Sequence, residues 1–226
     1  MAATKEARGR RDSVRRQQIL DTALALFSAK AYEDVSVDDV SEAAGVAHGL
    51  ISYYFGNKRG LFAAAVSQAW KELVDFERPT DEEITPAERV HGFVRRHFQY
   101  VCEHPTRFAT LMRTGHADRD VYEIIIGARG QAMADLQLTL GCPVNPPAHL
   151  RAALRAWMGY LDSMTLDWAL HRDLDLNFVT DLCVQALVAS VRASSGETFD
   201  ATEELDALGR VATPSPTAMA GALPSN

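Results

Sequence analysis

The sequence has few cysteines and no long apolar run, and both shortages narrow what this protein can be. Its 226 residues include three cysteines, Cys102, Cys142 and Cys183, an odd number that lacks the spacing of a metal site. We therefore expect reduced thiols in place of a disulfide framework, and no metal ion. No apolar stretch reaches the roughly 18 residues of a membrane span, and no signal-peptide core follows the charged N-terminus. These absences predict a soluble, cytoplasmic protein.

The sequence also lacks the motifs of the common catalytic classes. It has no glycine-rich phosphate loop, no nucleophile elbow and no Cys-x-x-Cys pair. His91 and His97 lie six residues apart and His104 follows seven residues later, so these histidines do not share one helical face as a metal-binding pair would. We therefore expect neither an enzyme nor a bound cofactor.

Positive charge is scarce overall but concentrated at the N-terminus. The net charge is −7, yet the first 30 residues hold seven Lys or Arg against three Asp or Glu, whereas residues 61–226 hold 14 against 22. Basic side chains bind DNA phosphates and can enter the minor groove. Residues 1–11 are predicted to form a disordered basic arm that either contacts DNA or is simply solvated. The basic residues leading into the first helix are Lys5, Arg8, Arg10, Arg11, Arg15 and Arg16.

Residues 37–56 have the pattern of two short helices that cross at a tight turn. Gly45 lies where the turn needs a positive φ, which costs little only without a Cβ atom. Ser36 and Asp39 have the spacing of a capping box, and Asn57 can cap the helix that follows. The residues predicted to point inward are Val40, Ala44, Val46, Ile51 and Tyr54. This pattern predicts a DNA-binding helix-turn-helix.

The side chains that packing does not need lie at the start and on the outer face of the second helix. This part of a recognition helix meets base edges in the major groove, and small residues there allow a close approach. Lys58 adds a positive charge in the first turn of the next helix, where a phosphate is favoured. The candidate DNA-binding residues are Ser36, Val37, Ala47, His48, Gly49, Ser52, Tyr53, Tyr54 and Lys58.

Three stretches, Arg16–Phe27, Val35–Val46 and Gly49–Phe62, resemble the DNA-binding domain of TetR-type repressors. The resemblance is strong over residues 12–70 and weak beyond them. It implies that Tyr54 and Lys58 contact phosphates and that Ala47, His48, Gly49 and Tyr53 face bases. Most members of the family carry Tyr where this chain has Ser52. The string over residues 49–55 is instead similar to the branch that includes the choline-responsive betaine repressors, so the base preference stays open.

The rest of the chain reads as successive helices, which predicts an all-α protein with a larger helical ligand-binding and dimerisation domain after the helix-turn-helix domain. Helices are expected from 86 to about 103, over 106–113, near 119–140, near 148–171 and near 176–194. We place the DNA-binding domain at 12–60, the effector-binding and dimerisation domain at 61–195, and a disordered tail at 196–226.

Aromatic and soft apolar residues between the two ends suit a cavity for a small-molecule effector, although ordinary core packing explains most of them. The candidate effector-binding residues are Phe93, His97, Tyr100, Phe108, Met112, Tyr122, Ile126, Trp157, Tyr160 and Met164. The last two helices are too apolar for both faces to meet water, so one face is expected to pair with a second copy in a four-helix bundle. The candidate dimerisation residues are Leu154, Leu161, Trp168, Val179, Leu182, Ala186 and Leu187.

These patterns predict a homodimeric repressor that a small molecule releases from a palindromic operator in double-stranded DNA. Two alternatives from other classes stay open. One is a helical thiol sensor that uses Cys102 or Cys142, and the other is a protein-interaction module that does not bind DNA. Thiol-dependent release from DNA would favour the sensor, and absence of DNA binding at low salt would favour the interaction module.

Overall fold

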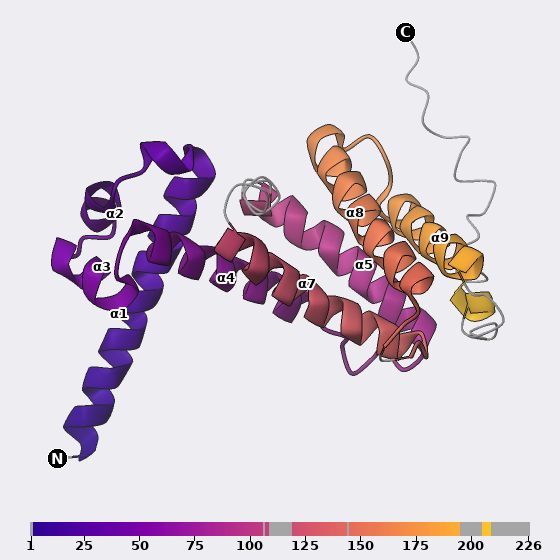
Figure 1. Ribbon diagram of the computed structural model, residues 1–226, viewed down its shortest axis with the longest axis horizontal. Helices are drawn as coiled ribbons and strands as arrows, with labels where there is room; N and C mark the ends of the chain where they lie inside the picture. The colour runs from indigo at the N-terminus through magenta and orange to yellow at the C-terminus, as the bar shows by residue number, and fades with distance from the viewer. Residues whose placement is uncertain (1, 106, 109–118, 144, 195–204, 209–226) are drawn as a thin grey trace, which may run out of the picture. The chain divides into compact units, whose positions relative to one another are not determined.

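The computed structural model describes residues 2–105, 107, 108, 119–143, 145–194 and 205–208, and every regular element in this part of the chain is helical (Figure 1). Side chains are not described at residues 2–8, 119–122, 124–126, 128 and 131. The elements are α1 (Ala2–Ala29), the 3-10 turn η1 (Tyr32–Asp34), α2 (Val37–Ala43), α3 (His48–Phe55), α4 (Lys58–Glu77), α5 (Pro86–Glu103), α7 (Arg119–Thr139), α8 (Ala148–His171) and α9 (Leu176–Ser194). The predicted all-α fold is confirmed.

Contacts between residues divide the chain into two compact units. Unit 1 comprises Met1–Val74 and His104–Arg129, and unit 2 comprises Asp75–Glu103 and Gly130–Asn226. The domain boundary expected after residue 60 falls at the start of α4, whereas the contacts of unit 1 continue to Val74. The first unit therefore contains the helix-turn-helix together with most of α4.

Local signals determine where the helices of the helix-turn-helix begin and end. The N–H of Asp39 donates to Ser36 Oγ over 3.0 Å, and the N–H of Ser36 donates to the Asp39 carboxylate over 2.7 Å, which confirms the predicted capping box at α2. Gly45, in the turn, has a φ of +62°, a conformation that side chains with a Cβ rarely adopt. Asn57 Oδ1 accepts from the N–H of Gly60 over 2.9 Å and caps α4, as predicted.

The helix-turn-helix packs on α1 through a small apolar core. Val40 and Ile51 are fully buried, and Gln18 of α1 donates through Nε2 to the carbonyl of Ala44 over 3.0 Å. The rings of Phe27 and Phe62 meet edge to face with centroids 4.7 Å apart, which joins α1 to α4. Val46 and Tyr54, which were expected inside, are half-buried.

Helix α1 begins earlier than the sequence pattern predicted. It starts at Ala2, so the segment 1–11, expected to be a disordered arm, is helical from its second residue. Ala2, Ala3, Glu6 and Ala7 are strong helix formers, and they extend the helix that Ile19 anchors in the core.

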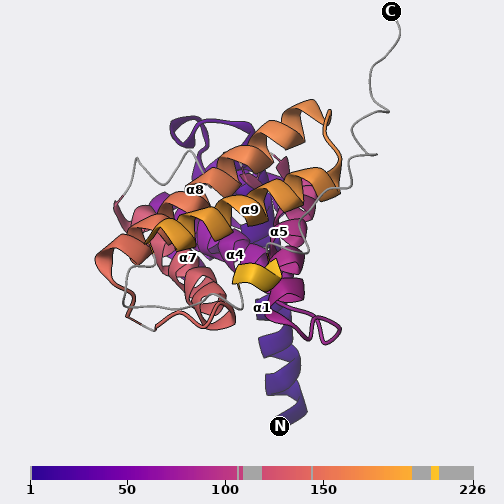
Figure 2. The ribbon, with the colours of Figure 1, turned by 90° about the vertical axis from the view of Figure 1, so that its right-hand side faces the viewer.

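In unit 2, helices α5, α8 and α9 pack against one another, and α8 and α9 run side by side in both views (Figures 1 and 2). Their bounds agree with the helices predicted over 86–103, 148–171 and 176–194. A second capping box starts α5, because Thr85 Oγ1 accepts from the N–H of Glu88 and the Glu88 carboxylate accepts from the N–H of Thr85. The core includes Val94, Phe98, Leu136, Leu140, Leu150, Leu154, Trp157, Leu161, Val184 and Val188.

One part of the predicted disordered tail is ordered. Residues 205–208 form a helical turn whose Leu205 and Leu208 are buried in the core of unit 2. The prediction of a disordered tail over 196–226 is therefore wrong for these four residues. Burial of the two leucine side chains against the helices of unit 2 favours the ordered turn. Residues 196–204 and 209–226 lie outside the described part. Of the short helix expected over 106–113, Arg107 and Phe108 are helical and the rest lies outside the described residues.

Helix α9 is long and apolar enough to cross a membrane by length and composition alone, with a mean hydropathy of 1.2 over its most apolar window. Its Val179, Cys183 and Leu187, however, are buried against the other helices of unit 2. Core helices of soluble proteins pass the same length and composition test. One such helix does not indicate a membrane protein.

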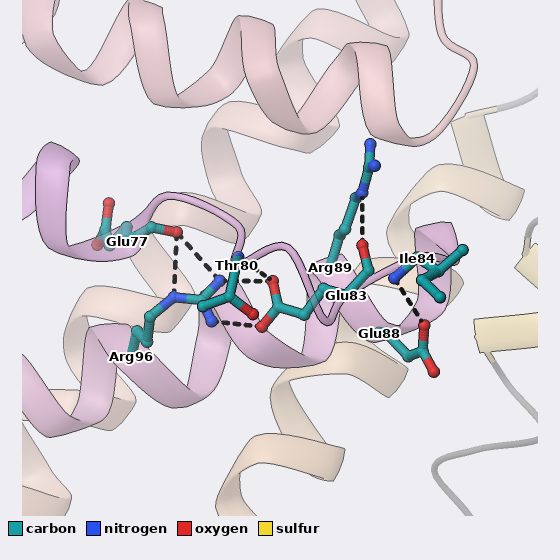
Figure 3. A network of polar contacts seen from close by, with 7 residues as sticks. All are labelled: Glu77, Thr80, Glu83, Ile84, Glu88, Arg89 and Arg96. Atoms are coloured by element: carbon teal, nitrogen blue, oxygen red, sulfur yellow. Dashed lines mark hydrogen bonds and ion pairs between the residues drawn. The ribbon is translucent and has the colours of Figure 1, made fainter.

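A network of polar contacts fixes the loop between α4 and α5 (Figure 3). Arg96 of α5 pairs with the carboxylate of Glu83 and donates through Nε and Nη2 to the carbonyl of Glu77, each over 3.3 Å. Gly92 makes room for this pair, since a Cβ there would lie 1.8 Å from Glu83 Oε1. Arg89 Nε donates to the carbonyl of Glu83 over 3.0 Å. The loop thus holds the end of α4 against α5.

Candidate functional site

The outer face of α3 is an exposed surface of the helix-turn-helix that carries polar side chains. Ile51 is buried and anchors the helix, whereas His48, Gly49 and Ser52 are exposed and Tyr53 is 78% exposed. Ala47 is the N-cap residue of α3 and makes no side-chain capping bond, so no side chain of the N-cap covers the backbone N–H groups of the first turn. The structure therefore brings the predicted base-facing residues together on one accessible surface.

Gly49 is not required by the protein's own packing. A Cβ atom built at this position meets nothing within 4 Å, and its φ lies outside the positive range that favours glycine. Glycine inside a helix costs about 1 kcal/mol relative to alanine. The open space beside Gly49 suits the close approach of another molecule.

His48 has a partner that the sequence pattern did not reveal. Its Nδ1 lies 2.6 Å from Oδ1 of Asp38, in the first turn of α2. Asp38 is ten residues away in the sequence, and it becomes adjacent only when the turn at Gly45 brings α2 and α3 together. The sequence contained one hint of this contact. Asp39 completes the capping box of α2, so the side chain of the neighbouring Asp38 is not needed for the cap.

Several of the predicted DNA-binding residues also make contacts inside unit 1. Lys58 Nζ lies 4.4 Å from the centroid of the Tyr32 ring and donates to the carbonyl of Glu33 over 3.3 Å. Tyr54 donates its hydroxyl to Asp12 over 3.4 Å, and burial, followed by the charge of Asp12, raises the pKa of Tyr54. Ser36 uses its hydroxyl in the cap of α2, where Val37 is the first residue and is half-buried.

The basic residues of α1 are exposed at every position whose side chain is described, namely Arg10, Arg11, Arg15 and Arg16. The guanidinium of Arg16 lies 5.2 Å from the centroid of the Phe55 ring, at the end of α3. Lys5 and Arg8 have side chains outside the described part. The basic charge of this helix therefore lies on the unit that carries α3.

The predicted effector-binding residues divide between the two units. Phe93, His97, Tyr100, Trp157, Tyr160 and Met164 all lie in unit 2, where His97, Tyr100 and Trp157 are buried and the other three are half-buried. Phe93 joins two of them, with its ring centroid 6.5 Å from His97 and 6.4 Å from Trp157. Phe108 is buried in unit 1. Met112 lies outside the described residues, and so do the side chains of Tyr122 and Ile126.

A buried ionisable cluster lies among these aromatic residues. His97 Nδ1 is 2.6 Å from Oε1 of Glu77, and His97 Nε2 is 3.7 Å from Oδ1 of Asp162. Burial raises the pKa of Glu77, and the hydrogen bond from His97 opposes that rise. Sequence reasoning missed Glu77, because it lies 20 residues from His97 and follows an apolar stripe.

The predicted dimerisation residues are mostly used inside the chain. Leu154, Leu161, Trp168, Val179 and Leu187 are buried in the core of unit 2, so the prediction that they form the face toward a second copy is wrong in this structure. The helical spacing of these apolar residues identified the face of α8 and α9 that packs inside unit 2. Leu182 is 38% exposed and Ala186 is half-buried. Exposed small residues on α8 and α9 include Ala152, Ala156, Gly159, Ser163, Ala189 and Ala193.

Comparisons with known proteins match both the N-terminal and the C-terminal part of the chain. A family model described as bacterial regulatory proteins, tetR family, matches residues 19–65, and one described as tetracyclin repressor-like, C-terminal domain, matches residues 86–190. The crystal structure of a tetR-family transcriptional regulator from Streptomyces coelicolor aligns with a TM-score of 0.67 at 30% sequence identity, over 88% of both chains.

Curated relatives match mainly through the N-terminal part. The HTH-type transcriptional regulator BetI of Serratia proteamaculans (strain 568) is 31% identical over 88 residues, which is 38% of this chain and 44% of the relative. The biofilm operon icaADBC HTH-type negative transcriptional regulator IcaR of Staphylococcus epidermidis is 22% identical over 96 residues, 42% of this chain and 50% of the relative. The match thus spans half or less of their length. With both family models and the structural match over 88% of both chains, the chain belongs to the TetR family of DNA-binding bacterial transcriptional regulators.

Proposed function

We propose that this regulator is a cytoplasmic homodimeric repressor that binds a palindromic operator through α3. The observation that carries the proposal is the exposed face of α3, where His48, Gly49, Ser52 and Tyr53 are left over after Ile51 has packed inward. The exposed arginines of α1 supply positive charge for phosphates. A relative named as a negative transcriptional regulator supports repression as the outcome of binding.

The functional domains follow the same proposal. Residues 12–60 bind DNA, and residues 61–195 bind an effector and form the dimer. We place the dimer contact on the exposed side of α8 and α9, where Leu182 and small residues such as Ala156 and Gly159 would let two copies approach closely. Unlike the buried leucines of these helices, these side chains are available to a second chain.

The effector belongs in the interior of unit 2. Phe93, Trp157, Tyr160 and Met164 offer aromatic and soft apolar surface, and the nearby His97 cluster offers polar groups that could orient a small amphipathic molecule. A ligand releases DNA only if it prefers the state in which the two copies of α3 are wrongly spaced.

The burial of Cys142 argues against a thiol sensor that uses this cysteine. Burial raises the pKa of the Cys142 thiol to about 11 and that of Cys183 to about 12, so few thiolates are present at neutral pH. Cys102, the other cysteine considered for a sensor, is half-buried.

The decisive experiment is selection of bound fragments from random duplex DNA, followed by footprinting. We expect two half-sites on one face of the duplex, about one helical turn or a multiple apart. Calorimetric titration of a candidate ligand with and without this DNA then tests release, because the affinity must fall by the same factor in both directions. A footprint without dyad symmetry argues against a symmetric dimer, and an unchanged ligand affinity argues against the release mechanism.

A further inference from the structure

The contact between Asp38 and His48 joins the two helices of the helix-turn-helix at their outer surface. His48 is the first residue of α3 and Asp38 lies in the first turn of α2, with Nδ1 and Oδ1 2.6 Å apart. The side chains remain 84% exposed at Asp38 and 57% exposed at His48. The pair therefore lies at the surface on which the exposed residues of α3 are found.

The packing of α2 against α3 does not depend on this pair. Val40 and Ile51 are fully buried between the helices and α1, and Gln18 ties the turn to α1. A contact between side chains so exposed to water contributes little to the stability of the fold. The contact has a geometric effect instead, because it restricts the rotation of the imidazole ring.

The chemistry of the contact determines what the ring presents to a partner. An ionised carboxylate can only accept hydrogen bonds, so the hydrogen of neutral His48 lies on Nδ1 and is donated to Asp38. Nε2 then carries a lone pair and acts as an acceptor. In the major groove, the base donors that such an acceptor can read are the exocyclic amino groups of adenine and cytosine.

The neighbouring residues favour a role in DNA recognition. A carboxylate near the DNA backbone is repelled by the phosphates and weakens binding to every sequence. Asp38 therefore costs DNA affinity unless it has a compensating role in recognition. Asp39 beside it serves as part of the α2 cap, whereas Asp38 turns to His48. A Cβ built at the adjacent Gly49 has no atom within 4 Å beyond its two chain neighbours and the backbone of its own helix, so the start of α3 leaves room for a base edge to approach.

We propose that Asp38 is a positioning residue for base recognition: it holds His48 so that Nε2 accepts a hydrogen bond from the amino group of one adenine or cytosine in each half-site. This inference rests on the proposed binding of DNA through α3. It adds a residue that contacts no base itself and acts through the orientation and tautomer of its neighbour.

The test uses the full-length protein, the duplex selected by the parent, and every single-base-pair variant of one half-site. Asp38→Ala should reduce discrimination at one base pair by about fivefold to tenfold, the factor expected for one hydrogen bond. His48→Ala should reduce discrimination at the same base pair, and the double variant should lose no more than either single variant. Asp38→Asn, whose amide oxygen still accepts from Nδ1, should retain part of the preference.

Glu42→Ala is the matched control, since Glu42 is an exposed carboxylate one turn further along α2. It should change affinity for all duplexes alike and leave base preference intact. The proposal is overturned if Asp38→Ala behaves like this control, or if Asp38→Ala and His48→Ala change discrimination at different base pairs. Circular dichroism confirms that each variant is folded. Failure of the parent to select any duplex would instead refute the proposed DNA-binding function.

Discussion

His97 and Glu77 form a buried hydrogen-bonded pair, with His97 Nδ1 and Glu77 Oε1 2.6 Å apart and both side chains almost inaccessible to water. The pair joins the end of α4 to the middle of α5, and Arg96 binds the backbone carbonyl of the same Glu77. Asp162 of α8 lies on the other side of the imidazole. Three helices of the chain thus meet at one histidine.

The buried carboxyl of Glu77 should make folding stability depend on pH. Its pKa is raised in the folded protein, chiefly by burial, so its contribution to stability is present below its ordinary value of 4.5 and is lost as pH rises through the folded pKa. Glu77→Gln removes this dependence. Denaturation of both proteins between about pH 4 and 8 should show the free energy of unfolding of the parent falling relative to the variant as pH rises.

The exposed Glu82→Gln is the control for this comparison and should follow the parent at every pH. A parent that instead gains stability relative to Glu77→Gln as pH rises would show that the ion pair with His97 outweighs burial.

Gly49→Ala should change stability and DNA binding in opposite directions. A Cβ meets no atom of the protein at this position, so alanine should stabilise the helix by about 0.5–1 kcal/mol. The same methyl group fills the space next to the proposed base-reading surface and should weaken operator binding several-fold. Thermal unfolding and a binding isotherm measure the two effects. Gly130→Ala, on α7 with equally open surroundings, should stabilise without affecting DNA. Operator affinity equal to that of the parent would contradict close approach at Gly49.

Gly92→Ala should destabilise the protein, although alanine is the better helix former. The new Cβ would lie 1.8 Å from Glu83 Oε1 and displace the carboxylate from Arg96 (Figure 3). We expect a loss of about 1–2 kcal/mol, because both partners are largely buried. Chemical denaturation beside Gly130→Ala gives the comparison. A stabilised Gly92→Ala protein would mean that the loop readily rearranges.

Glutamate substitutions at two leucines of α9 should separate dimerisation from folding. Leu182 is 38% exposed, so Leu182→Glu should give a folded monomer if this face meets a second copy. Leu187 is fully buried in the chain's own core, so Leu187→Glu should unfold unit 2. Light scattering and circular dichroism distinguish these outcomes. A monomeric parent at micromolar concentration, or a dimeric Leu182→Glu protein, would exclude the proposed dimer face.

The local features of this fold could be predicted from the sequence because each depends on residues close together in the chain. The capping boxes at Ser36 and Thr85 and the positive φ at Gly45 arise within one or two helical turns. The bounds of α5, α8 and α9 could also be predicted locally, because each helix ends where the apolar periodicity breaks. The exposed residues of α3 followed from the same local pattern.

The sequence by itself thus determined most helices and the exposed face of α3, whereas tertiary structure decided which apolar stripe faces inward and which polar residues meet. Leu154 and Leu187 have the spacing of a contact face, and only packing shows that this contact lies inside the chain. Leu205 is ordered by a core that forms far from it in sequence. The pairs Asp38 with His48 and Glu77 with His97 join different helices. Periodicity reports that a helix has an apolar face, but the partner of that face depends on contacts between distant segments.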